Sequence, residues 1–120
     1  MMSKKDIIKL SIIIPCFNEK NTLIKIISKI LLSLNNHNFK SYEILIVDDG
    51  STDGTTEMIK ENFSTKNNFK TFFHDENLGK GAAIKTAKNN LSGDIIIIQD
   101  ADLEYDPNDY EKLLKPIVDG

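Results

Sequence analysis

Four short apolar runs, each rich in β-branched or aromatic residues, constrain the fold of this chain more than any other feature. They alternate with segments of helical periodicity and read LSIIIPC (10–16), YEILIVDD (42–49), FKTFFHD (69–75) and GDIIIIQD (93–100). Strands that are apolar throughout are typical of parallel sheets, because the crossover helices cover both faces. Since such crossovers are right-handed, we predict an α/β fold with a doubly wound, mainly parallel sheet and helices on both faces.

The segments between and after these runs carry the helical signals. Apolar residues in 21–34 recur at the spacing of a single helix face, and residues 50–63 begin with Ser, Thr and Asp side chains that suit a helix N-terminus. Residues 79–91 carry a narrow alanine-rich face, and residues 106–120 begin with Asp106 as a cap followed by proline. We therefore predict four helices and a single domain over 1–120.

Charge and cysteine content exclude several classes of protein. The 15 basic and 18 acidic residues give a net charge of −3 without a lysine-rich block, which argues against a nucleic-acid partner. Cys16 is the only cysteine, so an intrachain disulfide and a cysteine-based zinc site are excluded, and a reducing, cytoplasmic setting is expected. The apolar start of the chain is too short and too polar for a signal peptide or a membrane-spanning helix, and no other segment approaches that length.

Three polar clusters follow predicted strands directly. They are PCFNE (15–19), DDGSTD (48–53) and DADLE (100–104). The carboxyl ends of parallel strands meet at one edge of a sheet, which is where open α/β sheets bind their ligands. The shared position of the clusters therefore predicts a binding site at that edge.

The last cluster has the composition of a metal site. In an extended segment, Asp100, Asp102 and Glu104 point to one side, where three ionised carboxylates repel one another. A divalent cation relieves that repulsion, and oxygen ligands of this kind suit Mg²⁺ or Mn²⁺. The alternative is a solvated acidic loop in which Asp106 only caps the last helix.

The order of the motifs also resembles a known family. SIIIPCFNE, YEILIVDDGSTDGT, NLGKGAAIKTA and GDIIIIQDADLEYDP are similar to the nucleotide-sugar-binding half of glycosyltransferase family 2, over roughly residues 8–119. The resemblance implies a Rossmann-like GT-A fold and inverting, metal-dependent transfer of a sugar from a nucleoside diphosphate. The polyprenyl-phosphate mannosyl- and glucosyltransferases of the family are the most similar. It also implies that residues 1–120 are shorter than a full catalytic domain of this family.

The resemblance assigns roles to residues of the first two clusters. Pro15, Asn18 and Glu19 are expected to lie against the nucleotide, although Asn18 and Glu19 could equally be turn and cap residues of the following helix. Asp48 and Asp49 match the acids that contact the base or ribose. Ionised carboxylates only accept hydrogen bonds, which suits the N–H and hydroxyl donors of a nucleoside.

Further assignments fall on the turn after Asp49 and on the carboxyl half of the chain. Ser51, with Gly50, is expected to shape the turn at the nucleotide. Asp100 and Asp102 match the family's D-x-D pair, which makes them the metal-binding and catalytic acids, and Glu104 completes the coordination. In NLGKG, Gly79 allows close backbone approach and Lys80 could reach a phosphate, although an exposed lysine is often only solvated.

The expected partners are a UDP- or GDP-sugar donor, an acceptor such as a lipid phosphate or a saccharide hydroxyl, and Mn²⁺ or Mg²⁺. A lipid-phosphate acceptor would bring the protein to the cytoplasmic face of a membrane as a peripheral protein. Unpaired sheet edge and apolar surface favour self-association or a partner chain. His37 and His74 are far apart in the sequence and lack ligand spacing, so neither is assigned a role.

Three other interpretations remain open. The chain could be a noncatalytic nucleotide-binding module that needs a partner chain. A dinucleotide site is suggested by Gly79-x-Gly81 at the start of a helix, but Ile84 replaces the third glycine and residues 75–78 lengthen the turn. An aspartyl-phosphate enzyme would use acids at strand ends, yet it leaves PCFNE and NLGKG unexplained.

Overall fold

The computed structural model describes residues 8–101, which form four strands and three helices. In chain order the elements are β1 (Leu10–Cys16), α2 (Leu23–Asn36), β2 (Tyr42–Asp48), α3 (Thr55–Asn62), β3 (Phe69–Phe73), α4 (Lys80–Lys88) and β4 (Ile95–Ile98). Every strand pair within these residues is parallel, in the order β3-β2-β1-β4. No helix within residues 8–101 is long and apolar enough to cross a membrane.

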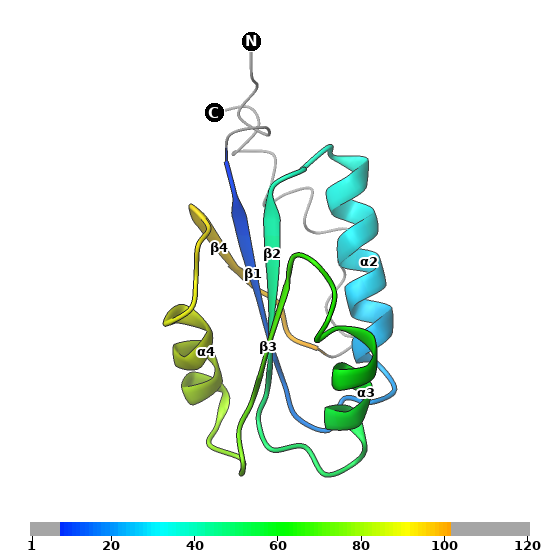
Figure 1. The fold of residues 1–120 in the computed structure, drawn as a ribbon, viewed down its shortest axis with the longest axis vertical. Coiled ribbons are helices and arrows are strands. Elements are labelled where there is room, and N and C mark those ends of the chain that lie inside the picture. The colour runs from blue at the N-terminus through cyan, green and yellow to red at the C-terminus, as the bar shows by residue number, and fades with distance from the viewer. Residues whose placement is uncertain (1–7, 102–120) are drawn as a thin grey trace.

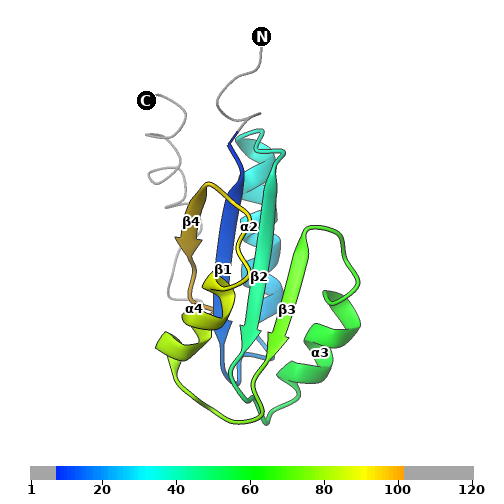
Figure 2. The same ribbon diagram turned by 60° about the vertical axis from the view of Figure 1, so that its left-hand side comes forward.

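The helices lie on both faces of the sheet, as Figures 1 and 2 show. On one face, α2 and α3 bury their apolar sides against Ile12, Ile14, Ile44 and Ile46 of the central strands. On the other face, Ala83 and Ala87 of α4 pack on Ile13, Leu45 and Val47. Alanine has a short side chain, so α4 lies close to the sheet. The predicted doubly wound α/β fold is therefore confirmed.

The predicted elements match the described ones closely, with exceptions in burial at the two edge strands. All four apolar runs form strands, and the helices predicted over 21–34, 50–63 and 79–91 are present. The helix predicted over 106–120 lies outside the described residues.

In β3 every residue is half-buried or exposed, and β4 is not buried on both faces. Ile97 is buried on the α2 side, but Ile96 and Ile98 are 44% and 42% exposed. The reason is the position of α4, which packs on β1 and β2 and leaves the neighbouring surface of β4 open. The expectation that unpaired sheet edge and apolar surface promote self-association stays a prediction, and these two isoleucines are among the exposed apolar side chains.

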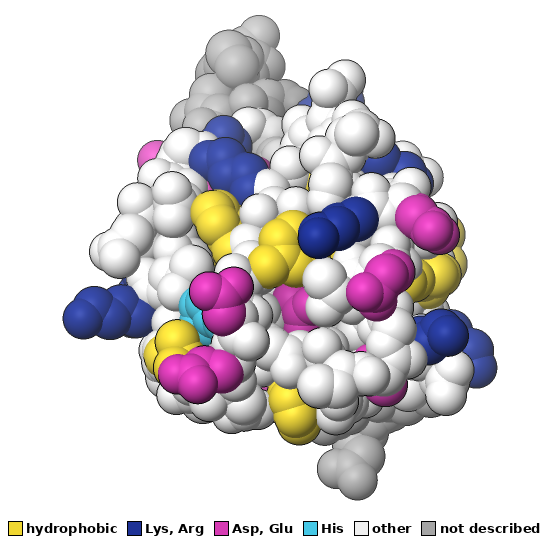
Figure 3. Space-filling model, turned by 60° about the horizontal axis from the view of Figure 1, so that its bottom comes forward, with side chains coloured by type: hydrophobic (Ala, Val, Ile, Leu, Met, Phe, Trp, Pro, Cys, Tyr) yellow, Lys and Arg dark blue, Asp and Glu magenta, His cyan; other side chains and the backbone are white. Residues whose placement is uncertain are grey.

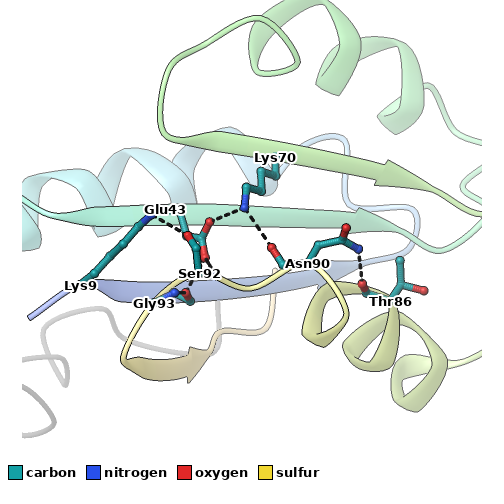
Figure 4. Close-up of polar contacts among 8 residues, drawn as sticks. Lys9, Glu43, Lys70, Thr86, Asn90, Ser92 and Gly93 are labelled. Carbon is teal, nitrogen blue, oxygen red and sulfur yellow. Dashed lines mark hydrogen bonds and ion pairs between the residues drawn. The ribbon is translucent and has the colours of Figure 1, made fainter.

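A buried carboxylate joins the strands at the opposite end from the predicted site (Figure 4). Glu43 of β2 lies beside Ser11 of β1 in register and accepts a hydrogen bond of 2.6 Å from its hydroxyl. It also accepts the backbone N–H of Ser92 at 2.7 Å and pairs with Lys70 Nζ of β3 at 2.8 Å. Gly93 N–H donates to the Ser11 hydroxyl at 2.9 Å. Lys70 Nζ also donates to Asn90 O at 2.9 Å, so the α4–β4 connection is fastened to three strands.

Candidate active site

The loops that follow β1, β2 and β3 meet at the carboxyl edge of the sheet. Backbone hydrogen bonds continue past the strand ends: Asp49 N–H donates to Cys16 O and His74 N–H donates to Asp48 O, both at 2.9 Å. Beside these loops lies a cleft of about 240 Å³. Six of the predicted site residues line it, namely Pro15, Glu19, Asp49, Gly79, Lys80 and Asp100. Figure 3 shows acidic side chains gathered on this face of the molecule.

Asn18 and Ser51 join the first two loops instead of lining the cleft. Asn18 adopts a left-handed conformation (φ 53°), which asparagine tolerates better than most residues. Its backbone N–H donates to Ser51 Oγ at 2.9 Å, and its side-chain oxygen accepts the N–H of Thr52 at 2.8 Å. This is the turn role considered for Asn18, and it fixes the two loops relative to each other.

Glu19 combines a turn role with a place in the cleft. Its carbonyl oxygen accepts the N–H groups of Thr22 and Leu23, which begin α2. Its carboxylate lies 2.6 Å from the hydroxyl of Thr22, and its own N–H donates to Thr55 Oγ1 at 3.1 Å. The predicted nucleotide contact of Glu19 remains untested, but its carboxylate is held at the wall of the cleft.

Asp48 is buried on the α3 side of the sheet. One carboxylate oxygen accepts the N–H of Ser51 at 3.1 Å, and the other is hydrogen bonded to the hydroxyl of Thr56 in α3. Both oxygens therefore have partners within the protein, and Asp48 does not line the cleft. Its contact with base or ribose stays a prediction, and its described role is to close the turn that leads into α3.

Asp49 is also buried but points to the opposite side of the sheet. Its carboxylate accepts the backbone N–H groups of Leu78 at 2.9 Å and Gly79 at 2.8 Å, and it pairs with His74 Nδ1 at 2.8 Å. Burial alone would raise the pKa of the Asp49 carboxyl, but the hydrogen bonds from His74 and the two amides outweigh it and lower that pKa. Asp49 is therefore an ionised carboxylate. Its hydrogen bonds hold the loop between β3 and α4 beside the cleft.

The loop held by Asp49 rests directly on the turn at Gly50. A Cβ atom at Gly50 would lie 2.5 Å from the carbonyl carbon of Glu76 and 2.6 Å from the nitrogen of Asn77. Gly50 also has a φ of 77°, a conformation in which a side chain is strained. Glycine is needed here for both reasons, so the turn after β2 and the loop before α4 pack backbone against backbone.

Lys80 and Asp100 face each other across the cleft. Lys80, the first residue of α4, places its Nζ atom 2.5 Å from Oδ1 of Asp100, which follows β4. Both side chains are about half exposed, so each remains accessible to a ligand. The structure thus brings together a cation suited to phosphate and the first acid of the predicted D-x-D pair.

The expected metal site is described only at Asp100. This half-exposed carboxylate at the cleft is a donor that suits Mg²⁺ or Mn²⁺. Asp102 and Glu104, its expected companions, lie outside the described residues. Within residues 8–101, no three His, Cys, Asp or Glu side chains are grouped to hold a metal ion. The metal site therefore stays a prediction to which Asp100 contributes suitable chemistry.

His74 belongs to this region, although its sequence position assigned it no role. It directly follows β3, and its imidazole lies between Asp49 and Thr86 of α4, with Nε2 2.8 Å from the threonine hydroxyl. Its place at the end of a predicted strand was a usable signal, because the other polar clusters were assigned from that position. The connection from His74 to Gly79 is also longer than the tight turn of a dinucleotide fingerprint.

Residues 11–120 match the model of one protein family, glycosyl transferase family 2. Curated relatives include the undecaprenyl-phosphate 4-deoxy-4-formamido-L-arabinose transferases of Aeromonas hydrophila and Salmonella choleraesuis. The chain is 30% and 32% identical to them over 99% and 100% of its length. It spans only 36% and 37% of their length.

Two solved structures with the same fold contain Mn²⁺ together with a nucleoside diphosphate or a nucleotide sugar. Glucosyl-3-phosphoglycerate synthase from Mycobacterium tuberculosis, in complex with Mn²⁺, UDP and glucosyl-3-phosphoglycerate, has a TM-score of 0.73 and 23% identity; the match covers 98% of this chain and 42% of that one. A mannosyltransferase from Pyrobaculum calidifontis, in complex with GDP-mannose and Mn²⁺, has a TM-score of 0.68 and 24% identity over 85% and 30% of the two chains. The chain belongs to glycosyl transferase family 2 and has the Rossmann-like fold of its GT-A members.

Proposed function

We propose that this chain is the nucleotide-sugar-binding part of a metal-dependent, inverting glycosyltransferase. The observation that carries the proposal is the cleft at the carboxyl edge of the sheet, where Lys80 and Asp100 face each other beside the loop held by Asp49. A nucleoside diphosphate needs both a cation for its phosphates and acceptors for its nucleoside donors. The residues of this cleft offer both.

The binding roles follow from side-chain chemistry. Asp100, with Asp102 and Glu104, is proposed to hold Mn²⁺ or Mg²⁺ beside the diphosphate. Such a cation, when bound, neutralises charge on the departing nucleoside diphosphate. Lys80 is proposed to leave Asp100 and contact a phosphate oxygen, since an ammonium group donates to phosphate as a point charge. Glu19 and Asp49, which line the cleft, are proposed to accept hydrogen bonds from the nucleoside.

The acceptor is proposed to be a polyprenyl phosphate. Two curated relatives of the chain are transferases named for undecaprenyl phosphate. A phosphate acceptor is already anionic and needs little help from a general base, in contrast to a saccharide hydroxyl. It attacks the anomeric carbon from the face opposite the diphosphate, and the sugar is transferred with inversion. The donor is a UDP- or GDP-sugar, in line with the ligands named for the two structural neighbours.

Calorimetric titration tests the proposal. UDP, GDP and their sugar conjugates are titrated into the 120-residue chain with Mn²⁺, with Mg²⁺ and then with EDTA. We expect metal-dependent binding of one nucleotide that is lost in the Asp100→Ala/Asp102→Ala variant. The matched control is Glu57→Ala/Glu61→Ala, which removes two exposed acids of α3 and changes the net charge equally. Absence of binding by the folded wild-type chain would contradict the proposed function.

A noncatalytic nucleotide-binding module is the second candidate. The chain matches about a third of the length of its curated relatives. Both candidates bind the nucleotide, so turnover separates them. We expect transfer from a radiolabelled donor to undecaprenyl phosphate to be weak or absent for these 120 residues alone. Turnover comparable to that of a full-length relative would exclude the noncatalytic candidate.

A further inference from the structure

The side chain of His74 connects two elements that are distant in the sequence. It is only 11% exposed, with Nδ1 2.8 Å from Asp49 Oδ1 and Nε2 2.8 Å from Thr86 Oγ1. Because the Asp49 carboxylate is ionised and only accepts hydrogen bonds, Nδ1 of His74 carries a hydrogen and donates it. His74 therefore fixes the orientation of the Asp49 carboxylate between β2 and α4.

Asp49 in turn holds the loop between β3 and α4. Its Oδ1 atom accepts from both His74 Nδ1 and Leu78 N–H, and its Oδ2 atom accepts from Gly79 N–H. The loop thus leaves β3 at His74 and returns to the same carboxylate four residues later. The Asp49 carboxylate therefore binds both ends of the loop.

The loop has little else to hold it in place. All four of its residues, 75–78, are exposed, and Leu78 contributes no buried apolar side chain. Segments with few buried contacts open readily unless hydrogen bonds order them. The hydrogen bonds to Asp49 and the backbone packing on Gly50 are the described contacts that order this loop.

The position of the cleft residues depends on this order. Gly79, with a φ of 100°, directly precedes Lys80, and both line the cleft. If the amides of Leu78 and Gly79 leave Asp49, the start of α4 is released and Lys80 loses its fixed position opposite Asp100. The position of Lys80 in the cleft therefore depends on the imidazole of His74, which does not itself line the cleft but acts through Asp49.

We propose that His74 is a positioning residue of the sugar-nucleotide site, acting through Asp49 on the loop that carries Gly79 and Lys80. This inference rests on the proposed function for its ligand, but the ordering of the loop is independent of any ligand. The two parts can therefore be tested separately.

Two isosteric substitutions distinguish positioning from a general structural role. Asparagine places an N–H donor close to the position of His Nδ1, whereas glutamine places one close to Nε2. His74→Asn keeps the hydrogen bond to Asp49, and His74→Gln keeps only the one to Thr86. His74→Ala removes both, and Thr86→Val tests the second contact alone.

The first readout is amide hydrogen exchange at Leu78 and Gly79, measured by NMR without nucleotide. We expect exchange to be about tenfold faster or more in His74→Ala and His74→Gln, the loss associated with one hydrogen bond to a charged group. His74→Asn and Thr86→Val should stay within about threefold of the wild type. Unchanged exchange in His74→Ala overturns the inference whatever the nucleotide results are.

The second readout is calorimetric affinity for UDP and GDP with Mn²⁺, with thermal unfolding of each variant measured alongside. We expect His74→Ala and His74→Gln to bind about tenfold more weakly or worse, and His74→Asn to restore binding. Faster exchange with unchanged affinity would overturn the positioning role and leave the proposed function intact. A wild-type chain that binds neither nucleotide would overturn the proposed function and the assignment of His74 to its site.

Discussion

His74 Nδ1 lies 2.8 Å from Asp49 Oδ1, although 25 positions separate the two residues in the chain. The contact joins the end of β3 to the end of β2, at the place where the loop between β3 and α4 begins. Buried polar groups that are fully paired fix a single arrangement, whereas removal of one partner leaves the other unsatisfied. The pair therefore predicts strong energetic coupling between the two side chains.

Asp49→Asn tests that coupling. Asparagine keeps one acceptor but presents an N–H₂ group where Asp49 accepts an amide, so we expect a loss of about 1–3 kcal/mol in the free energy of unfolding. In a double-mutant cycle with His74→Ala, measured by urea unfolding, the two losses should fall short of additivity by about 0.5–3 kcal/mol. Strict additivity would mean that the contact contributes nothing.

Gly50→Ala should disturb the site without touching the cleft. The left-handed conformation costs an alanine about 1–2 kcal/mol. The added Cβ atom also meets the backbone of Glu76 and Asn77, which must move away. We expect a lower melting temperature and weaker nucleotide binding. Gly81→Ala is the control, because a Cβ atom there meets nothing within 4 Å; equal effects of the two variants would contradict the close packing described at Gly50.

Lys80→Met should affect metal and nucleotide binding in opposite directions. Without nucleotide, Lys80 competes with a cation for Asp100, so its removal should tighten Mn²⁺ binding about two- to fivefold, the range of an exposed ion pair. With UDP or GDP present, loss of the phosphate contact should weaken nucleotide binding. Lys88→Met, at the other end of α4, removes the same charge and should change neither affinity. Calorimetry with and without nucleotide measures both effects.

Glu43 makes the stability of the fold dependent on acid pH. Burial alone would raise its pKa, but the partners Lys70, Ser11 and Ser92 outweigh burial and lower the pKa from 4.5 to about 2. The contribution of Glu43 is therefore complete above pH 4.5 and is lost as the pH falls from 4.5 to about 2. That loss is on the order of 3 kcal/mol.

Urea unfolding between pH 7 and pH 2 measures this loss. In Glu43→Gln the free energy of unfolding should be lower at pH 7 and should decrease less toward acid pH than in the wild type. Glu57→Gln removes an exposed carboxylate of α3 and should keep the wild-type slope. Parallel pH profiles for Glu43→Gln and the wild type would rule out the lowered pKa of Glu43 as a source of stability.

The strands and helices were predictable because their signals are local. Runs such as Ile12–Ile14 and the apolar periodicity of residues 21–34 specify an element from its own residues. The ends of the strands then predicted which edge of the sheet carries the cleft, because the carboxyl ends of parallel strands lie at the same edge. The burial of β4 was not predictable, because the exposure of Ile96 and Ile98 depends on where α4 comes to rest.

The interior of the candidate site was predictable only in part. Asp49 and Asp100 were identified from their positions at strand ends and both line the cleft. The partners of Asp49 could not be predicted, because His74 and Gly79 reach it through a loop whose path no sequence spacing encodes. The same holds for Glu43, whose partners are set by the register of β1 with β2 and by the path of the α4–β4 connection.

The central place of β1 in the sheet affects how a newly made chain completes its fold. Lys9, just before β1, donates its backbone N–H to Asp94, which lies 85 residues further along the chain. At a synthesis rate of about 5–20 residues per second, about 4–17 s pass between the appearance of the two residues. During that time the edge of β1 that later pairs with β4 is an unpaired apolar strand, which is a template for association with other chains. The nascent protein is therefore most vulnerable to misassembly until Ile95–Ile98 leaves the ribosome and closes that edge.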